Sequence, residues 1–180
     1  MWQFLAFAAV ALGGVGLYNA LVKLREQVDA AWADIDVQLK RRYDLIPNIV
    51  ETVKGYAAHE QKTLEAVISA RSAAMGAQGP AQKGQAEGML GGALKSLFAL
   101  AEAYPDLKAA EGFRDLQGTL ADMESAIQQA RRYYNAVVRD YNTRIQQVPS
   151  NIIARSFNFR EREFFEIPDA EKAAPEVSFS

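Results

Sequence analysis

The chain has 180 residues, with 20 Lys and Arg against 22 Asp and Glu, so its formal net charge is −2. This balance argues against a dedicated nucleic-acid-binding protein, which would carry a basic patch or stripe. The absence of cysteine excludes disulfides, thiol catalysis and cysteine-based metal sites, and a single histidine narrows the remaining catalytic options.

The first 22 residues contain no charged side chain. About 20 apolar residues in a helix cross a hydrocarbon core of about 30 Å. Trp2 and Tyr18 lie toward the two ends of this segment, where aromatic rings favour the membrane interface. A cleavable signal peptide would need a basic region before the apolar one, whereas the first cation is Lys23. We therefore expect residues 1–22 to form a retained transmembrane anchor in contact with the lipid bilayer.

Lys and Arg predict the orientation of this anchor. Lys23 and Arg25 follow the apolar segment directly, and no cation precedes it. Positive flanks favour the cytoplasmic side, so we expect the N-terminus outside and the bulk of the chain in the cytoplasm. Within the segment, Ala9 and Gly13 form a small-xxx-small pair, which is a candidate helix–helix contact. Ordinary tolerance of small residues in membrane helices is the alternative.

The soluble part has the pattern of an all-helical protein. From Val28 onward apolar residues recur at helical spacing, and no stretch alternates in the manner of a half-buried strand. Neither Gly nor Pro occurs between Leu17 and Ile46. We therefore expect the membrane helix to continue outward as a rod and to run as far as Met75.

Pro47 is the one interruption of this first helix. Proline removes the hydrogen bond to the carbonyl of Tyr43 and crowds that carbonyl, so it either kinks or ends the helix. The apolar phase runs through Pro47 without a slip, which favours a kinked, continuous helix. The alternative is a break, with Asp44 as the cap of a new helix and Pro47 in its first turn.

Residues 76–92 hold six of the 12 glycines, which predicts a mobile connection after the first helix. A second helix is expected over about 93–104, ending before Pro105 because a residue before proline avoids helical geometry. A third is expected over about 107–147, with apolar steps of three and four that approach the coiled-coil repeat. The predicted fold is all-α: a transmembrane helix running into an elongated antiparallel bundle of three long helices, or four if Pro47 breaks the first.

The C-terminal part divides in two. Residues 152–165 are too apolar for a free linker, and we expect them to fold back on the bundle. Residues 167–180 are polar and contain proline, so we expect a disordered tail. The predicted organisation is therefore an anchor over 1–22, a bundle domain over 23–166 and a tail over 167–180.

Several stretches together resemble a known family. They are QLKRRYDLIPN (38–48), EAYPDL (102–107), the spaced residues from Phe113 to Ile127, ARxxYN at 130–135 with the Tyr141-Asn142 repeat, and the pair Phe164-Phe165. Over about residues 19–166 the chain is similar to the LemA family. The resemblance implies a bacterial single-pass membrane protein of the cytoplasmic (inner) membrane with a helical bundle. It also implies relatives of ill-defined activity, one branch of which is associated with magnetosome membranes.

The residues do not assemble a catalytic motif. His59-Glu60 resembles the start of a zinc-protease motif, but Thr63 stands where the second histidine belongs. A di-iron bundle needs a histidine on each of two helices, and this chain has one. We therefore expect no catalytic residues, no metal site and no cofactor.

Polar residues near the apolar stripes are the remaining candidates. Arg71, Glu124 and Arg131 are expected to form an internal polar network, because buried charges must be paired. Asn135 and Asn142 lie seven residues apart on one side of the third helix. They either fix helix register or contact a second copy or another partner. A small-ligand site is the alternative for this set.

The basic run Lys40-Arg41-Arg42 is expected to be a solvated helix face. It lies about 27 Å beyond Val22 in a straight helix, at about 1.5 Å per residue. Attraction to lipid headgroups decays within about 8–10 Å, so contact with the same membrane is not expected.

These observations favour a non-enzymatic, membrane-anchored scaffold that self-associates, as a homo-oligomer, or organises other membrane proteins. An adaptor or regulator of a membrane enzyme such as a protease is the second hypothesis. An extracytoplasmic sensor bundle is the third, and it requires the opposite orientation.

Overall fold

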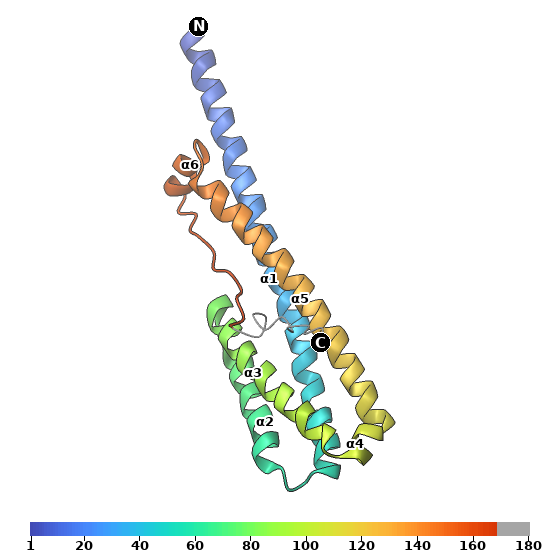
Figure 1. The fold of residues 1–180 in the computed structure, drawn as a ribbon. Helices are drawn as coiled ribbons and strands as arrows, with labels where there is room; N and C mark the ends of the chain where they lie inside the picture. The colour runs from blue at the N-terminus through green and yellow to red at the C-terminus, as the bar shows by residue number, and fades with distance from the viewer. Residues whose placement is uncertain (169–180) are drawn as a thin grey trace, which may run out of the picture. The chain divides into compact units, whose positions relative to one another are not determined.

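The computed structural model describes residues 1–168, without the side chains of Ala6 and Val10, and these residues form an all-α protein. The predicted disordered tail lies outside the described residues from position 169 onward. In order, the helices are α1 (Trp2–Tyr56), α2 (Gln61–Gly76), α3 (Gly79–Glu102), α4 (Pro105–Ala109), α5 (Glu111–Gln146) and α6 (Ser150–Ser156) (Figure 1). No strand occurs within residues 1–168, which confirms the predicted fold class.

Helix α1 runs without a break from the apolar N-terminal segment through Pro47 to Tyr56. The predicted continuity past Pro47 is confirmed. The alternative of a new helix capped by Asp44 is wrong, because Asp44 lies exposed in the middle of α1. The helix ends 19 residues before the predicted end at Met75. Between Ala57 and Leu64 no apolar side chain continues the buried stripe, and a turn over residues 57–60 replaces the helix.

The described residues divide into two compact units. Unit 1 comprises residues 1–35 and 129–164, and unit 2 comprises residues 36–128 and 165–168. Helices α1 and α5 each contribute one part to both units.

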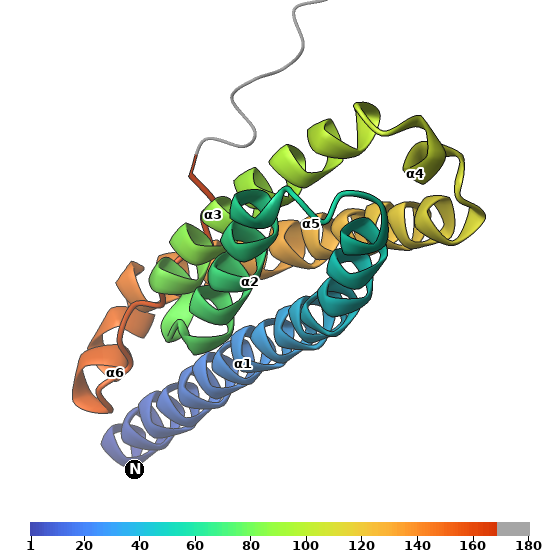
Figure 2. The ribbon, with the colours of Figure 1, turned by 90° about the horizontal axis from the view of Figure 1, so that it is seen from below.

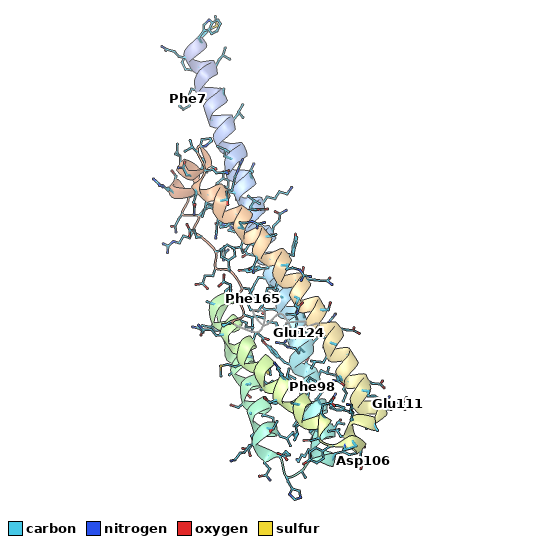
Figure 3. The ribbon with its side chains drawn as sticks, in the orientation of Figure 1. Phe7, Phe98, Asp106, Glu111, Glu124 and Phe165 are labelled. Carbon is cyan, nitrogen blue, oxygen red and sulfur yellow. The ribbon has the colours of Figure 1, made fainter. Side chains whose placement is uncertain are left out.

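In unit 2 the end of α1, helices α2, α3 and α4 and the start of α5 surround one apolar core. Its buried residues include Leu39, Ile46, Ile49, Val53, Val67, Leu90, Leu94, Leu97, Leu107, Phe113, Leu120, Ile127 and Phe165. Helices α2 and α3 lie side by side (Figure 2). Phe98 of α3 and Phe113 of α5 add an aromatic contact, with ring centroids 6.2 Å apart (Figure 3 labels Phe98).

The prediction of a glycine-rich connection over residues 76–92 is wrong. The connection between α2 and α3 is limited to Ala77 and Gln78; Gly76 is the last residue of α2, and the other five glycines lie in α3. Pro80 occupies the first turn of α3, where its missing N–H costs nothing. Burial of Leu90, Leu94 and Leu97, together with close packing at Gly84, offsets the low helix propensity of glycine.

Unit 1 pairs the first part of α1 with the last part of α5. The rings of Trp32 and Tyr134 lie 5.2 Å apart, and Leu21, Val28, Ala31, Ile35, Val138, Tyr141 and Ile145 are buried. The described side chains of residues 1–13 are exposed, among them Phe7 (Figure 3). Within residues 1–168, α1 is the one helix long and apolar enough to cross a membrane, and its most apolar window is only 6% buried.

The predicted third helix is divided into α4 and α5, since Ala110 is extended between them. Helix α5 ends at Gln146, one residue from the predicted end. After α6 the chain continues without regular structure to Phe165, which is completely buried in unit 2, as expected for an apolar segment that folds back.

Candidate functional site

The most unusual feature of unit 2 is a buried charge cluster, formed by Arg42 and Tyr43 of α1, Glu87 of α3 and Glu124 of α5 (Figure 3 labels Glu124). Arg42 and Glu87 are each only 2% exposed. The guanidinium group of Arg42 pairs with the carboxylates of both Glu87 and Glu124. The hydroxyl of Tyr43 donates a hydrogen bond to Glu87. Three helices are therefore joined by one set of charges.

Helix periodicity explains why these side chains are inside. Arg42 lies three residues after Leu39 and four before Ile46, so it shares their buried stripe. Glu87 stands three residues before Leu90 in the same way on α3. The prediction that the whole run 40–42 is a solvated face is wrong for Arg42, whereas Lys40 and Arg41 are exposed.

Arg71 of α2 reaches the same segment of α1. Its Nε donates a hydrogen bond of 2.7 Å to the carbonyl oxygen of Tyr43. That carbonyl is the one that loses its helical partner because Pro47 has no N–H. Arg71 therefore supplies the missing donor from a neighbouring helix.

Burial affects the protonation of Tyr43 in this cluster. Desolvation raises the pKa of Tyr43 to about 12, with a smaller opposing effect of Arg42 and a further raising effect of Asp36. The ammonium group of Lys83 lies 5.9 Å from the Tyr43 ring centroid and 3.9 Å from the carboxylate of Asp36. Tyr43 thus remains a hydrogen-bond donor well above neutral pH.

Of the predicted network of Arg71, Glu124 and Arg131, the structure brings only Arg71 and Glu124 to the same segment of α1. Arg71 and Glu124 contact the adjacent residues 43 and 42 of α1, while Arg131 belongs to unit 1 and is half-buried. Sequence reasoning missed Arg42 and Glu87. Both residues lie at helical spacing from buried apolar residues, and this spacing was the available signal. The basic run 40–42 obscured it for Arg42, and the glycine content of residues 76–92 obscured it for Glu87.

Next to this cluster, the C-terminal segment over residues 166–168 packs against two glycines of α3, Gly84 and Gly88. A Cβ atom on Gly84 would overlap the carbonyl of Glu166, and one on Gly88 would meet Ile167 and Pro168 at 3.4–3.6 Å. These glycines serve close packing of backbone against backbone.

In unit 1, residues 158–164 form a strap held on α1 and α5. The side-chain amide of Asn142 donates to the carbonyl of Arg162 and accepts from its N–H, both at 2.9 Å. The guanidinium of Arg162 lies 3.0 Å from Asp29 of α1. The hydroxyl of Tyr134 donates to the carbonyl of Glu163 at 2.8 Å. Desolvation raises the pKa of Tyr134 to about 12, against the lowering effect of Arg162.

The residues predicted for contacts between copies fall into two groups. Asn142 has a structural role inside the chain, and Asn135 is half-buried and also partnered within it. Ala9 and Gly13 lie on the exposed part of α1, where nothing stands within 4 Å of a Cβ placed on Gly13. Contact of these four residues with another copy remains a prediction.

Among residues 1–168, no group of three or more His, Asp and Glu side chains is arranged to hold a metal ion. His59 is exposed in the turn between α1 and α2.

The model of the LemA family matches residues 31–179. The chain belongs to the LemA family. The match confirms the resemblance seen in the sequence motifs. It contains the whole buried charge cluster, and it begins within α1 after the apolar N-terminal segment.

This LemA-family chain is similar to proteins that are named as magnetosome proteins. It is 28% identical to the magnetosome protein MamQ of Magnetospirillum gryphiswaldense, over 82% of this chain and 64% of that protein. It is 27% identical to magnetosome protein MamQ 2 of Paramagnetospirillum magneticum, over 83% and 64%. The protein LemA of Metamycoplasma hominis is 24% identical, over 91% and 75%. The chain thus spans 64% of the length of the MamQ proteins.

Proposed function

We propose that this LemA-family protein is a membrane-anchored scaffold whose helical domain self-associates or organises other membrane proteins. The observation that carries the proposal is the continuity of α1. One helix of 55 residues contains both the exposed apolar segment and the buried stripes of the helical domain. A continuous helix transmits position and orientation, whereas a flexible linker would not.

Three further features support a role in assembly. The polar groups of the buried charge cluster and of Asn142 are occupied by contacts within the chain. The exposed apolar part of α1 offers Ala9 and Gly13, the type of small residue found where membrane helices approach closely. Two of the similar proteins are named as proteins of the magnetosome.

The first test is the mass of the full-length protein in mild detergent. We expect a discrete oligomer that Gly13→Leu disrupts, because the added side chain separates helices that pack closely at this position. Ala11→Leu is the matched control, since Ala11 lies on the opposite side of the same exposed helix segment.

A second test removes part of the apolar N-terminal segment, and the structure determines how many residues can be removed. Leu21 is fully buried in unit 1, so removal of residues 1–22 would damage the packing that the experiment should preserve. Removal of residues 2–13 deletes exposed residues instead. A monomer in every form would contradict self-association and favour the adaptor hypothesis, for which crosslinking in cells identifies the partner.

The proposed location is the bacterial inner membrane, with the N-terminus outside and the helical domain in the cytoplasm. Lys23 and Arg25 directly after the apolar segment support this orientation. Reporter fusions after Ser180 test it: activity of a reporter that works only in the cytoplasm is expected. Activity of a reporter that works only outside would support the sensor hypothesis.

A further inference from the structure

The end of unit 1 where α5 turns into α6 lies beside the apolar N-terminal segment. Ile153 of α6 approaches within 3.8 Å of a Cβ placed on Gly14. The rings of Tyr18 and Phe157 lie 4.8 Å apart. Within unit 1, contacts of α6 and Phe157 with α1 therefore reach back to Gly14, eight positions before Val22. At a rise of about 1.5 Å per residue, this is about 12 Å along the helix.

Apolar side chains at this end are not covered by protein. Val148 in the turn before α6 is 79% exposed, Ile152 of α6 is 61% exposed, and Phe157 directly after α6 is 60% exposed. Side chains of this size are normally buried on folding. We call these three exposed side chains the α6 patch.

Aromatic residues and cations mark a boundary next to the α6 patch. Tyr18 contacts Phe157 and also Phe159, whose ring centroid lies 5.8 Å away. The guanidinium group of Arg25 lies 5.4 Å from the centroid of Phe159. Rings that combine an apolar body with a polar neighbour of this kind are enriched at membrane interfaces.

The charges at this end have one sign. From Tyr141 to Arg160 the chain has three cations and no Asp or Glu, and no acidic residue precedes Glu26 in α1. Anionic lipid headgroups attract such clusters within a Debye length of about 8–10 Å.

We propose that α6 and the turn before it form a second membrane contact, lying in the interface of the same bilayer that α1 enters. The partner is the lipid surface: the α6 patch contacts the boundary of headgroups and acyl chains, and the arginines that flank it contact anionic phosphates. Amphipathic helices on membranes are buried by about 5–10 Å at this boundary, which agrees with the level of α6 on α1. This inference rests on the membrane insertion of α1, which is part of the proposed function.

Two membrane contacts have a mechanical consequence. A single helix leaves the attached domain free to rotate and tilt about its exit point. A second contact through α6 fixes unit 1 against the membrane surface, so unit 1 presents one constant face to its neighbours.

The absence of native cysteine makes the test direct. Single spin labels are placed on the full-length chain by Ile152→Cys, Leu12→Cys and Arg139→Cys, and each protein is reconstituted in vesicles of phosphatidylcholine and phosphatidylglycerol. All three positions are exposed, so the substitutions leave the packing intact. Collision of the label with oxygen, which concentrates in lipid, is compared with collision with a water-soluble nickel complex.

We expect the label at Ile152 to collide preferentially with oxygen, at a shallower depth than the label at Leu12. The label at Arg139, on α5 of the same unit, is expected to be in water. Val148→Cys provides a second probe of the α6 patch and should behave like Ile152→Cys. Circular dichroism of each variant confirms that its helix content is unchanged.

Other outcomes overturn the proposal in distinguishable ways. A label at Ile152 in water, with Leu12 in lipid, leaves the anchor in place and refutes the contact of α6. A label at Ile152 shielded from both reagents means that another protein surface covers the patch, which also refutes contact with lipid. A label at Leu12 in water refutes the anchor itself and the second contact with it.

Discussion

The Nε of Arg71 donates a hydrogen bond of 2.7 Å to the carbonyl of Tyr43, the one carbonyl in α1 whose helical partner is missing because residue 47 is proline. A buried carbonyl without a donor is costly. Helix α2 thus compensates, through the side chain of Arg71, for a proline in α1.

This coupling predicts a specific double-mutant result. Arg71→Ala is expected to lower the free energy of unfolding by about 1–3 kcal/mol, because the Tyr43 carbonyl loses its donor. In a Pro47→Ala background the residue at 47 again has an N–H, so the same change is expected to cost clearly less. Chemical unfolding in mild detergent, followed by circular dichroism, measures both values. Equal costs in the two backgrounds would contradict the assignment, and Lys62→Ala on the exposed face of α2 is the control.

The buried charge cluster predicts a different pattern. Glu87→Leu leaves Arg42 buried without its main partner and should cost about 3–5 kcal/mol. Arg42→Met combined with Glu87→Leu should cost less than Glu87→Leu alone, since the unpaired charge is removed while Tyr43 retains the Ala74 carbonyl at 3.5 Å. Arg41→Met, on the exposed neighbour, should change stability by less than about 0.5 kcal/mol. Additive costs in the double variant would refute a direct charge pair.

Alkaline pH should destabilise the fold through two tyrosines. Burial raises the pKa of Tyr43 and of Tyr134 to about 12 in the folded chain, against an ordinary value of 10.0. The unfolded chain loses these protons first, so their contribution to stability is complete below pH 10.0 and is lost as pH rises toward 12. Tyrosinate absorbance should show a late phase that Tyr43→Phe and Tyr134→Phe each reduce. Tyr133→Phe, at an exposed position, should leave that phase unchanged.

Two glycines of α3 should respond with opposite signs to the same substitution. Gly84→Ala is expected to destabilise the fold and displace the C-terminal segment, because the new Cβ overlaps the backbone of Glu166. Gly92→Ala has open space around it and should stabilise α3 by about 0.5–1 kcal/mol through helix propensity. Unfolding midpoints of both variants decide the matter. A neutral or stabilising Gly84→Ala would show that the segment does not sit on α3.

Release of the strap is predicted for Asn142→Ala. The change removes two hydrogen bonds to the backbone of Arg162, each worth about 1 kcal/mol. Trypsin should then cleave faster after Arg160 and Arg162, which lie in the strap. Thr143→Ala, at the exposed neighbouring position, should leave the cleavage rate unchanged. An unaltered rate in Asn142→Ala would mean that other contacts hold the strap.

Local patterns were sufficient for the helical class, the continuity of α1 past Pro47 and the end of α5 near Gln146. These features follow from apolar periodicity and from the short-range effects of proline, which operate within a few residues. The LemA-family motifs belong to the same category, because they were visible as short stretches.

Only the tertiary structure decided the rest. Arg42 pairs with residues 45 and 82 positions away, so neither burial nor pairing was visible in a run of three basic residues. Gly84 is helical because a backbone segment 82 residues later packs against it, which overrides a composition typical of loops. The sequence by itself determined the helical class and the apolar stripes of the long helices, but not the helix bounds over residues 57–92. Contacts between distant segments determined which polar and small residues are buried beside the apolar ones, because burial is a property of the packed chain.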